Sequence, residues 1–190
     1  MDRTLKLALA SLIFNIAFAF YHLVFGIITR SWWLFIIGIY YLVLSVIRFV
    51  VLKSKEKDRF LVSFTGWMLM ILVLPLIGTV ILSFVRDRGV IFNMIIMLAI
   101  AVYAFTKITF AAINWIKTRK SNSVKLITLR NISFADAFVS IFSLQRSMLV
   151  SFDGMTDAEI RIMNILTGSG VCIIVFLLGV NLMCGKAGRK

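Results

Sequence analysis

The sequence has 190 residues, of which 61% are hydrophobic, and its mean hydropathy is +1.01. A soluble domain is excluded, because long apolar runs follow one another along almost the whole chain. The formal net charge is +13. The cations gather in short segments between the apolar runs, which is typical of membrane topology rather than of nucleic-acid binding.

Six segments are each long enough to cross ~30 Å of hydrocarbon as a helix. The predicted spans are Leu5–Thr29, Trp32–Leu52, Phe60–Phe84, Val90–Ile116, Leu129–Phe152 and Ile162–Met183. The first is interpreted as a retained span and not a signal peptide, because no small-residue cleavage site follows it. No connection is long enough to fold on its own. We therefore predict one all-α transmembrane domain over residues 1–190, a polytopic helix bundle.

Lys and Arg residues are distributed unequally between the two ends of these spans. One end holds Arg3, Lys6, Lys53, Lys55, Lys57, Arg59, Lys117, Arg119, Lys120, Lys125, Arg130, Lys186, Arg189 and Lys190. The other end holds Arg30, Arg86, Arg88 and Arg161. Because cytoplasmic loops carry the excess of cations, both termini are predicted to be cytoplasmic, in a multi-pass protein of the cell membrane.

The fifth span carries a stripe of polar residues. Its members are Ser133, Asp136, Ser140, Ser143, Ser147 and Ser151. They are spaced three or four residues apart, so they share one face of a helix. Such a helix is expected to turn its polar side toward other helices or a wet cavity, and its apolar side toward lipid.

Three ionisable residues are predicted to lie at a similar depth in the cytoplasmic half: Arg48, Lys107 and Asp136. Two cations and one carboxylate predict a salt bridge with one positive charge left over. Three interpretations remain open. In the first, Asp136 and Lys107 form a purely structural pair, and Arg48 reaches toward the lipid headgroups. Alternatively, the cations bind an anionic group while the serine stripe donates hydrogen bonds, or Asp136 protonates reversibly and couples transport to protons.

A second polar set is predicted in the outer half, where His22, Arg146 and the Thr167–Gly170 turn fall at comparable depth. Gly168 and Gly170 permit either close helix packing or a break in the sixth helix. Together these residues favour an outward-opening cavity, with tight packing as the alternative.

The first span has a polar face of its own. Ser11, Asn15 and His22 are separated by four and seven residues, so they lie on one side of a helix. This face is expected to pair with the serine stripe of the fifth span through hydrogen bonds between helices.

Catalytic and metal-binding signatures are missing from the sequence. One His and two Cys do not supply a zinc or haem ligand set. Asp136 is the only carboxylate deep in a predicted span, so no acidic pair for a divalent metal is present. We predict no cofactor, no metal site and no catalytic residue, and we rank a membrane enzyme as the third hypothesis.

Two stretches carry a resemblance to known proteins. They are FGIITRSWWLFIIGIYYLVLSVIRF at residues 25–49, and AFTKITFAAINWIKTRK at 104–120 together with LRNISFADAFVSIFSLQ at 129–145. These stretches resemble a family of small six-span bacterial membrane proteins without an assigned activity. A second, more distant resemblance is to the substrate-binding subunits of energy-coupling-factor vitamin transporters. Both resemblances imply six spans, and the second implies that both termini are inside.

The leading hypothesis is a protein that binds or transports a small solute, anionic or amphipathic, between the first, fourth, fifth and sixth spans. The candidate residues are Asp136, Lys107, Arg48, Ser140, Ser143, Arg146, His22 and Asn15. The alternative is a non-transporting membrane subunit or sensor that acts through a protein partner at the basic cytoplasmic loops. The lipid bilayer is the expected surroundings, and nucleic acid is not an expected partner.

Overall fold

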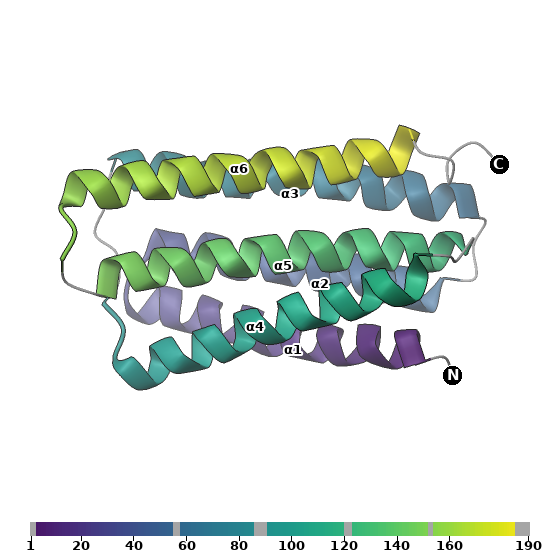
Figure 1. Cartoon of the computed structure of the whole chain (residues 1–190), viewed down its shortest axis with the longest axis horizontal. Coiled ribbons are helices and arrows are strands. Elements are labelled where there is room, and N and C mark those ends of the chain that lie inside the picture. The colour runs from purple at the N-terminus through teal and green to yellow at the C-terminus, as the bar shows by residue number, and fades with distance from the viewer. Residues whose placement is uncertain (1–2, 55–57, 86–90, 120–122, 152–153, 185–190) are drawn as a thin grey trace.

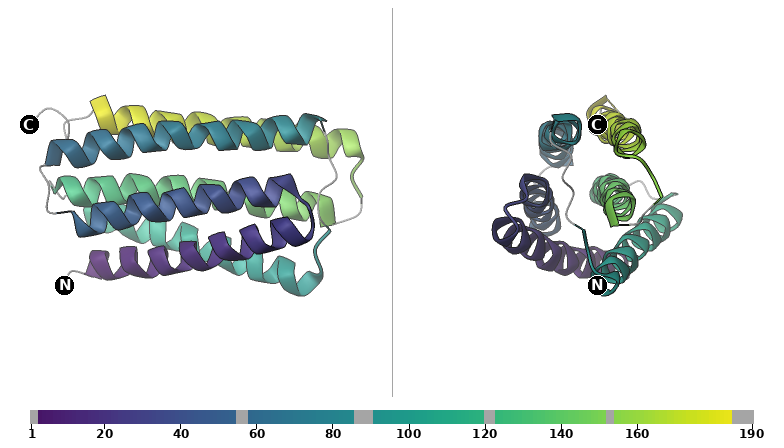
Figure 2. Two further views of the ribbon diagram at one scale, coloured as in Figure 1. Left: turned by 180° about the vertical axis from the view of Figure 1, so that it is seen from behind. Right: turned by 90° about the vertical axis from the view of Figure 1, so that its left-hand side faces the viewer.

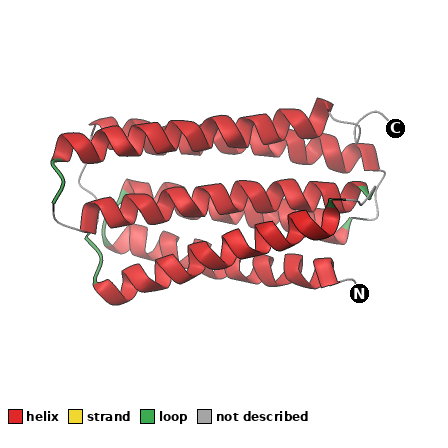
Figure 3. Ribbon diagram, viewed as in Figure 1, coloured by secondary structure: helices red, strands yellow, loops and turns green. Residues whose placement is uncertain are grey.

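The computed structural model describes residues 3–54, 58–85, 91–119, 123–151 and 154–184. In these ranges the chain forms six α-helices and no strand (Figure 3). The helices are α1 (Arg3–Ile28), α2 (Trp32–Lys53), α3 (Asp58–Val85), α4 (Met94–Thr118), α5 (Val124–Ser151) and α6 (Asp157–Cys184). The prediction of an all-α fold with six spans is confirmed.

Each of the six helices is long and apolar enough to cross a membrane. Only helices and closed barrels satisfy every backbone hydrogen bond inside hydrocarbon, so long helices are the structure that this composition dictates. The chain is therefore a multi-pass membrane protein. We call the end of the bundle where α1, α3 and α5 begin the basic end, and the opposite end the far end (Figure 1).

Two helices extend well beyond the spans predicted for them. Helix α5 begins five residues early, at Val124, and α6 begins five residues early, at Asp157. At α6 the reason is a capping box. The Thr156 backbone N–H donates to Glu159 Oε2 at 2.8 Å, and the Glu159 N–H donates to Thr156 Oγ1 at 3.4 Å. These polar turns lie beyond the apolar run, so hydropathy alone does not include them.

Helix α5 is the central element of the bundle. It packs against α2, α3, α4 and α6, and its side chains form hydrogen bonds with α1. The end-on view in Figure 2 places it within the arc of the other helices. Of the six candidate spans it is the least hydrophobic and the most buried, with 67% of an 18-residue stretch buried inside the protein. Because neighbouring helices and not lipid surround it, a helix with a polar stripe is stable there.

Helix α6 is continuous through the Thr167–Gly170 segment, so the helix break that these glycines permit is not observed. Gly168 instead permits close packing. A Cβ atom at this position would lie 2.6 Å from Val80 Cγ2 and 3.1 Å from Phe142 Cε2. Gly170 has open space around it, because a Cβ atom there would have nothing within 4 Å. Only the first of the two glycines is therefore required for packing.

We expect Gly168→Ala to lower stability by about 1–3 kcal/mol, because the added methyl group meets the stiff side chain of Val80 in a filled interface. Gly170→Ala is the matched control and is expected to raise stability by about 0.5–1 kcal/mol, because alanine is the better helix former. Thermal unfolding in detergent micelles measures both. Equal midpoints for the two variants would contradict the packing of α6 described here.

The α1–α2 connection is a tight turn that closes with a Schellman motif. The Ser31 N–H donates to Gly26 O at 3.0 Å, and the Arg30 N–H donates to Ile27 O at 3.3 Å. Arg30 has φ +51°, in the left-handed region where glycine is the usual residue. A side chain in this conformation costs roughly 1–2 kcal/mol.

Arg30→Gly is therefore expected to raise stability by about 1 kcal/mol, because glycine adopts the left-handed conformation without strain. Ser31→Gly serves as the control. Ser31 has φ −94° and its side chain forms no capping hydrogen bond, so glycine there only increases the freedom of the unfolded chain. Thermal midpoints in the same detergent compare the two, and a lower midpoint for Arg30→Gly would contradict the strain.

Candidate functional site

Asp136 on α5 lies at the centre of a group of charged side chains. Its Oδ2 atom is 2.7 Å from Lys107 Nζ on α4 and 3.2 Å from Arg48 Nη2 on α2. Asp136, Lys107 and Arg48 are 1%, 2% and 0% exposed as whole residues. The structure therefore brings together the three ionisable residues that depth counting places at one level. Each is carried by a different helix, so the ion pairs join α2, α4 and α5.

Two polar residues of α1 complete this group. Asn15 Nδ2 donates to Asp136 Oδ2 at 3.1 Å, and its Oδ1 atom accepts from Lys107. The Ser11 hydroxyl accepts from Lys107 Nζ at 3.0 Å and from Arg48, and it lies 3.5 Å from Asp136 Oδ2. We call Ser11, Asn15, Arg48, Lys107 and Asp136 the charge cluster. It involves α1, α2, α4 and α5, and not the sixth span that the sequence interpretation includes.

The charge cluster carries more positive than negative charge. Both cations contact the same carboxylate oxygen, Asp136 Oδ2, and no second acidic residue within the described ranges forms an ion pair with either of them. Two buried polar atoms, Asp136 Oδ1 and Arg48 Nε, have no hydrogen-bond partner among the described residues. A buried ion costs several kcal/mol unless it is matched by opposite charge, so one cation of this cluster is poorly compensated.

A layer of aromatic rings covers the cluster on the side toward the far end. The Tyr103 hydroxyl donates to Asn15 Oδ1 at 3.1 Å, and the Phe18 ring stacks on the Tyr103 ring at 3.5 Å between centroids. His22 lies on Phe18 at 4.6 Å between ring centroids, and its Nδ1 is 2.9 Å from Phe18 O. His22 therefore belongs to this aromatic layer and not to the charge cluster.

Arg146 lies nearer the far end, between α2, α3 and α5. Its Nη1 donates to the Ser83 hydroxyl, and its guanidinium lies 5.1 Å from the centre of the Trp33 ring. These contacts differ from those of His22, so the two residues that depth counting places level belong to separate groups. Neither residue lines any of the three pockets described below, so none of these corresponds to the predicted outward-opening cavity.

The hydrogen bonds of the serine stripe differ from those that the anion-site interpretation predicts. Ser140 Oγ donates to Asp136 O at 2.7 Å, and Ser147 Oγ donates to Ser143 O at 2.8 Å. A hydroxyl has one proton, so these serines have no donor left for a solute. Ser140 acts as an acceptor as well, since its hydroxyl accepts from the Tyr41 hydroxyl at 3.1 Å. Ser143 is buried and its Oγ has no partner among the described residues.

Three of the pockets that the described residues form lie outside the charge cluster. One of 330 Å³ lies at the far end of the α1–α2 pair, and one of 290 Å³ lies lower between the same helices. The third, of 180 Å³, lies between α3 and α6 at the basic end. None of the three is lined by Asp136, Lys107 or Arg48. The cluster is closed in this conformation, and a solute reaches it only when helices separate.

Sequence reasoning does not assign Ser11 and Tyr103 to the site. Ser11 is four residues from Asn15, and Tyr103 is four residues from Lys107, so each lies one turn from a residue that is assigned. That spacing is the signal that identifies them. In the described ranges no group of three or more His, Cys, Asp or Glu residues could hold a metal ion.

No protein-family model, curated protein or solved structure matches this chain.

The ion pairs of the cluster are tested by Asp136→Asn and Lys107→Met. Asp136→Asn leaves two cations without a counter-charge and is expected to cost about 3–5 kcal/mol. The double variant removes one of these cations, so it should be more stable than Asp136→Asn alone. Thermal unfolding in detergent gives the coupling between the two sites. Strictly additive effects would contradict a direct ion pair.

Proposed function

We propose that this membrane protein binds a small anionic solute at the charge cluster and carries it across the bilayer. One observation supports the proposal above all. Two cations and a single carboxylate are buried together at a depth where unmatched charge is costly. A bound anion would make the cluster neutral, so the solute supplies the missing charge.

The unpaired atoms of the cluster favour one kind of solute. Arg48 holds Asp136 through Nη2 while its Nε has no partner among the described residues. A planar carboxylate or a phosphate matches the fork of a guanidinium group. Asp136 Oδ1 is a free acceptor within the same ranges. A small oxyanion that also carries an O–H or N–H donor would engage both groups.

Access to the cluster requires movement of helices, and α4 is the candidate for that movement. It packs mainly on α5 and crosses α1 diagonally (Figure 1), and it carries both Lys107 and Tyr103. Displacement of α4 would break the contacts of Lys107 and the Phe18–Tyr103 stack together. Arg146 and Ser83, beyond the aromatic layer, would then offer the next polar contacts toward the far end.

The purified protein can be tested with acetate, lactate and phosphate as probe anions. A bound anion stabilises the folded state by about 2.7 kcal/mol at a hundredfold excess over the dissociation constant. We expect at least one probe to raise the thermal midpoint, and lactate to exceed acetate because it carries a hydroxyl donor. Arg48→Gln should abolish the increase, whereas Arg161→Gln, an exposed cation at the far end, should preserve it.

The binding site would be contradicted if no probe anion raised the thermal midpoint of the wild-type protein. It would also be contradicted if the same increase occurred in Arg48→Gln. Transport is measured separately, as uptake of the binding anion into vesicles that contain the protein. Binding without uptake would retain the site and reject transport.

A second candidate is a non-transporting subunit or sensor that acts through a protein partner. The observation that favours it is that the charge cluster is buried and closed. The two pockets between α1 and α2 are lined by residues outside the cluster. For this candidate the charge cluster would be structural. A protein whose midpoint responds to no small anion, yet which co-purifies with another membrane protein in constant ratio, would fit this candidate and not the first.

A further inference from the structure

Two of the pockets lie along one seam between α1 and α2. The lower pocket is lined by Leu12, Ile16, Ala19, Phe20, Leu23, Leu42, Ser45, Val46 and Phe49. The upper pocket is lined by Gly26, Ile27, Arg30, Ser31, Trp32 and Phe35. Their volumes are 290 and 330 Å³. Apart from Ser45, the residues that line the lower pocket are apolar, and the one charged residue, Arg30, lines the upper pocket.

Helical periodicity shows that the pockets share a face. On α1, Ile16, Phe20, Leu23 and Ile27 are separated by four, three and four residues. On α2, Phe35, Leu42, Val46 and Phe49 are separated by seven, four and three residues. Both sets follow single lines along their helices. From Leu12 to Ile27 the seam is roughly 22 Å long, which exceeds the half-thickness of a bilayer, about 15 Å.

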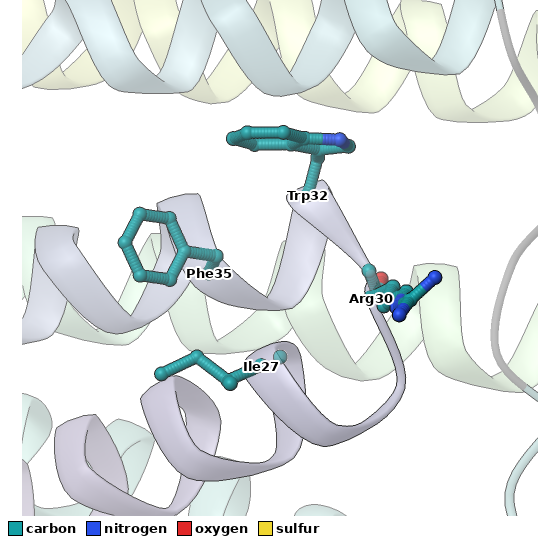
Figure 4. Close-up of a pocket in the computed structure, with 6 residues that line it drawn as sticks. Ile27, Arg30, Trp32 and Phe35 are labelled. Atoms are coloured by element: carbon teal, nitrogen blue, oxygen red, sulfur yellow. The ribbon is translucent and has the colours of Figure 1, made fainter.

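The upper end of the seam combines a cation with membrane-interface residues. Figure 4 shows Ile27, Phe35 and Trp32 grouped at the pocket, with the Arg30 side chain directed away from them. Arg30 and Trp32 are exposed, and the Arg30 guanidinium forms no ion pair with a carboxylate of the described residues. Tryptophan is enriched at the level of lipid headgroups, so this end of the seam is expected to lie there.

Arg30 also occupies a backbone position where another residue would be favoured. Its φ of +51° closes the Schellman motif, and glycine would fit that conformation without strain. The arginine therefore places a cationic residue beside the upper pocket despite a conformational penalty.

We propose that the α1–α2 seam binds one anionic phospholipid from the leaflet at the far end. The phosphate group lies on the Arg30 guanidinium, and one acyl chain lies along the apolar seam below it. Charge complementarity selects the headgroup, because a cation near the membrane surface attracts anionic lipids. The single charge at one end of a long apolar track matches the shape of a lipid.

A transmembrane helix from a partner protein fits the same seam less well. Helices approach each other closely where small residues line the contact. Here the exposed residues along the seam are bulky, including Ile16, Phe20, Leu42, Val46 and Phe49. A helix with its side chains is about 10–12 Å wide, whereas an acyl chain enters between such side chains without displacing them. The lower pocket therefore suits a single chain.

The proposal is tested in nanodiscs of phosphatidylglycerol and phosphatidylcholine in equal amounts, with retained lipids identified by native mass spectrometry. The wild-type protein is expected to retain one lipid, with phosphatidylglycerol preferred. Arg30→Ala should reduce that preference about fivefold, the factor for one cation near the surface. Arg161→Ala removes another exposed cation of the far end and should leave the preference unchanged.

A second pair of variants tests the seam itself. Val46→Trp fills the lower pocket from an exposed position and is expected to reduce retention of both lipids. Val102→Trp adds the same bulk to the exposed face of α4 and should not reduce retention. Equal effects of Arg30→Ala and Arg161→Ala, or unchanged retention in Val46→Trp, would overturn the lipid site. A second protein chain retained in place of lipid, and lost in Val46→Trp, would overturn it in favour of a partner helix.

Discussion

The structure depends on the need to match charge where water is absent. Asp136 Oδ2 receives contacts from α1, α2 and α4 while it is carried by α5, so one oxygen atom ties four helices together. Each ion in this group would be costly alone in hydrocarbon. The central position of α5 follows from the same need, because a helix that carries a carboxylate and a serine stripe requires protein on most of its sides.

The bundle combines two ways of holding helices together. The four helices of the charge cluster are joined by polar contacts, whereas glycines let α1 pack closely on α2 and α3 on α6. A Cβ atom on Gly179 would lie 3.0 Å from Gly66 O, so the two backbones approach closely. Polar contacts at the cluster can exchange partners, while close packing of α3 on α6 leaves little room for change. Movement that opens the cluster would therefore involve α4 more readily than the α1–α2 or α3–α6 pair.

The sequence predicts how deep each residue lies in the membrane. It does not predict the direction in which a side chain points around the axis of its helix. Hydropathy locates all six helices, and depth counting places Arg48, Lys107 and Asp136 at the level where they meet. The same counting places His22 level with Arg146, yet they belong to separate groups, because depth does not say which neighbour a helix faces. Nor does spacing show that Ser140 donates to its own helix, since that depends on the competing partners available.

The wide separation of the cluster's members along the chain bears on how the protein is made. Arg48 precedes its carboxylate by 88 residues, and Lys107 precedes it by 29. During synthesis the second and fourth helices therefore emerge before Asp136, the residue that neutralises their cations, has been made. Until α5 is inserted, two cations depend on water, headgroups or the insertion machinery for their solvation. A chain cut short before α5 keeps both cations and lacks their carboxylate, which makes such a fragment distinguishable from the finished protein by membrane quality control.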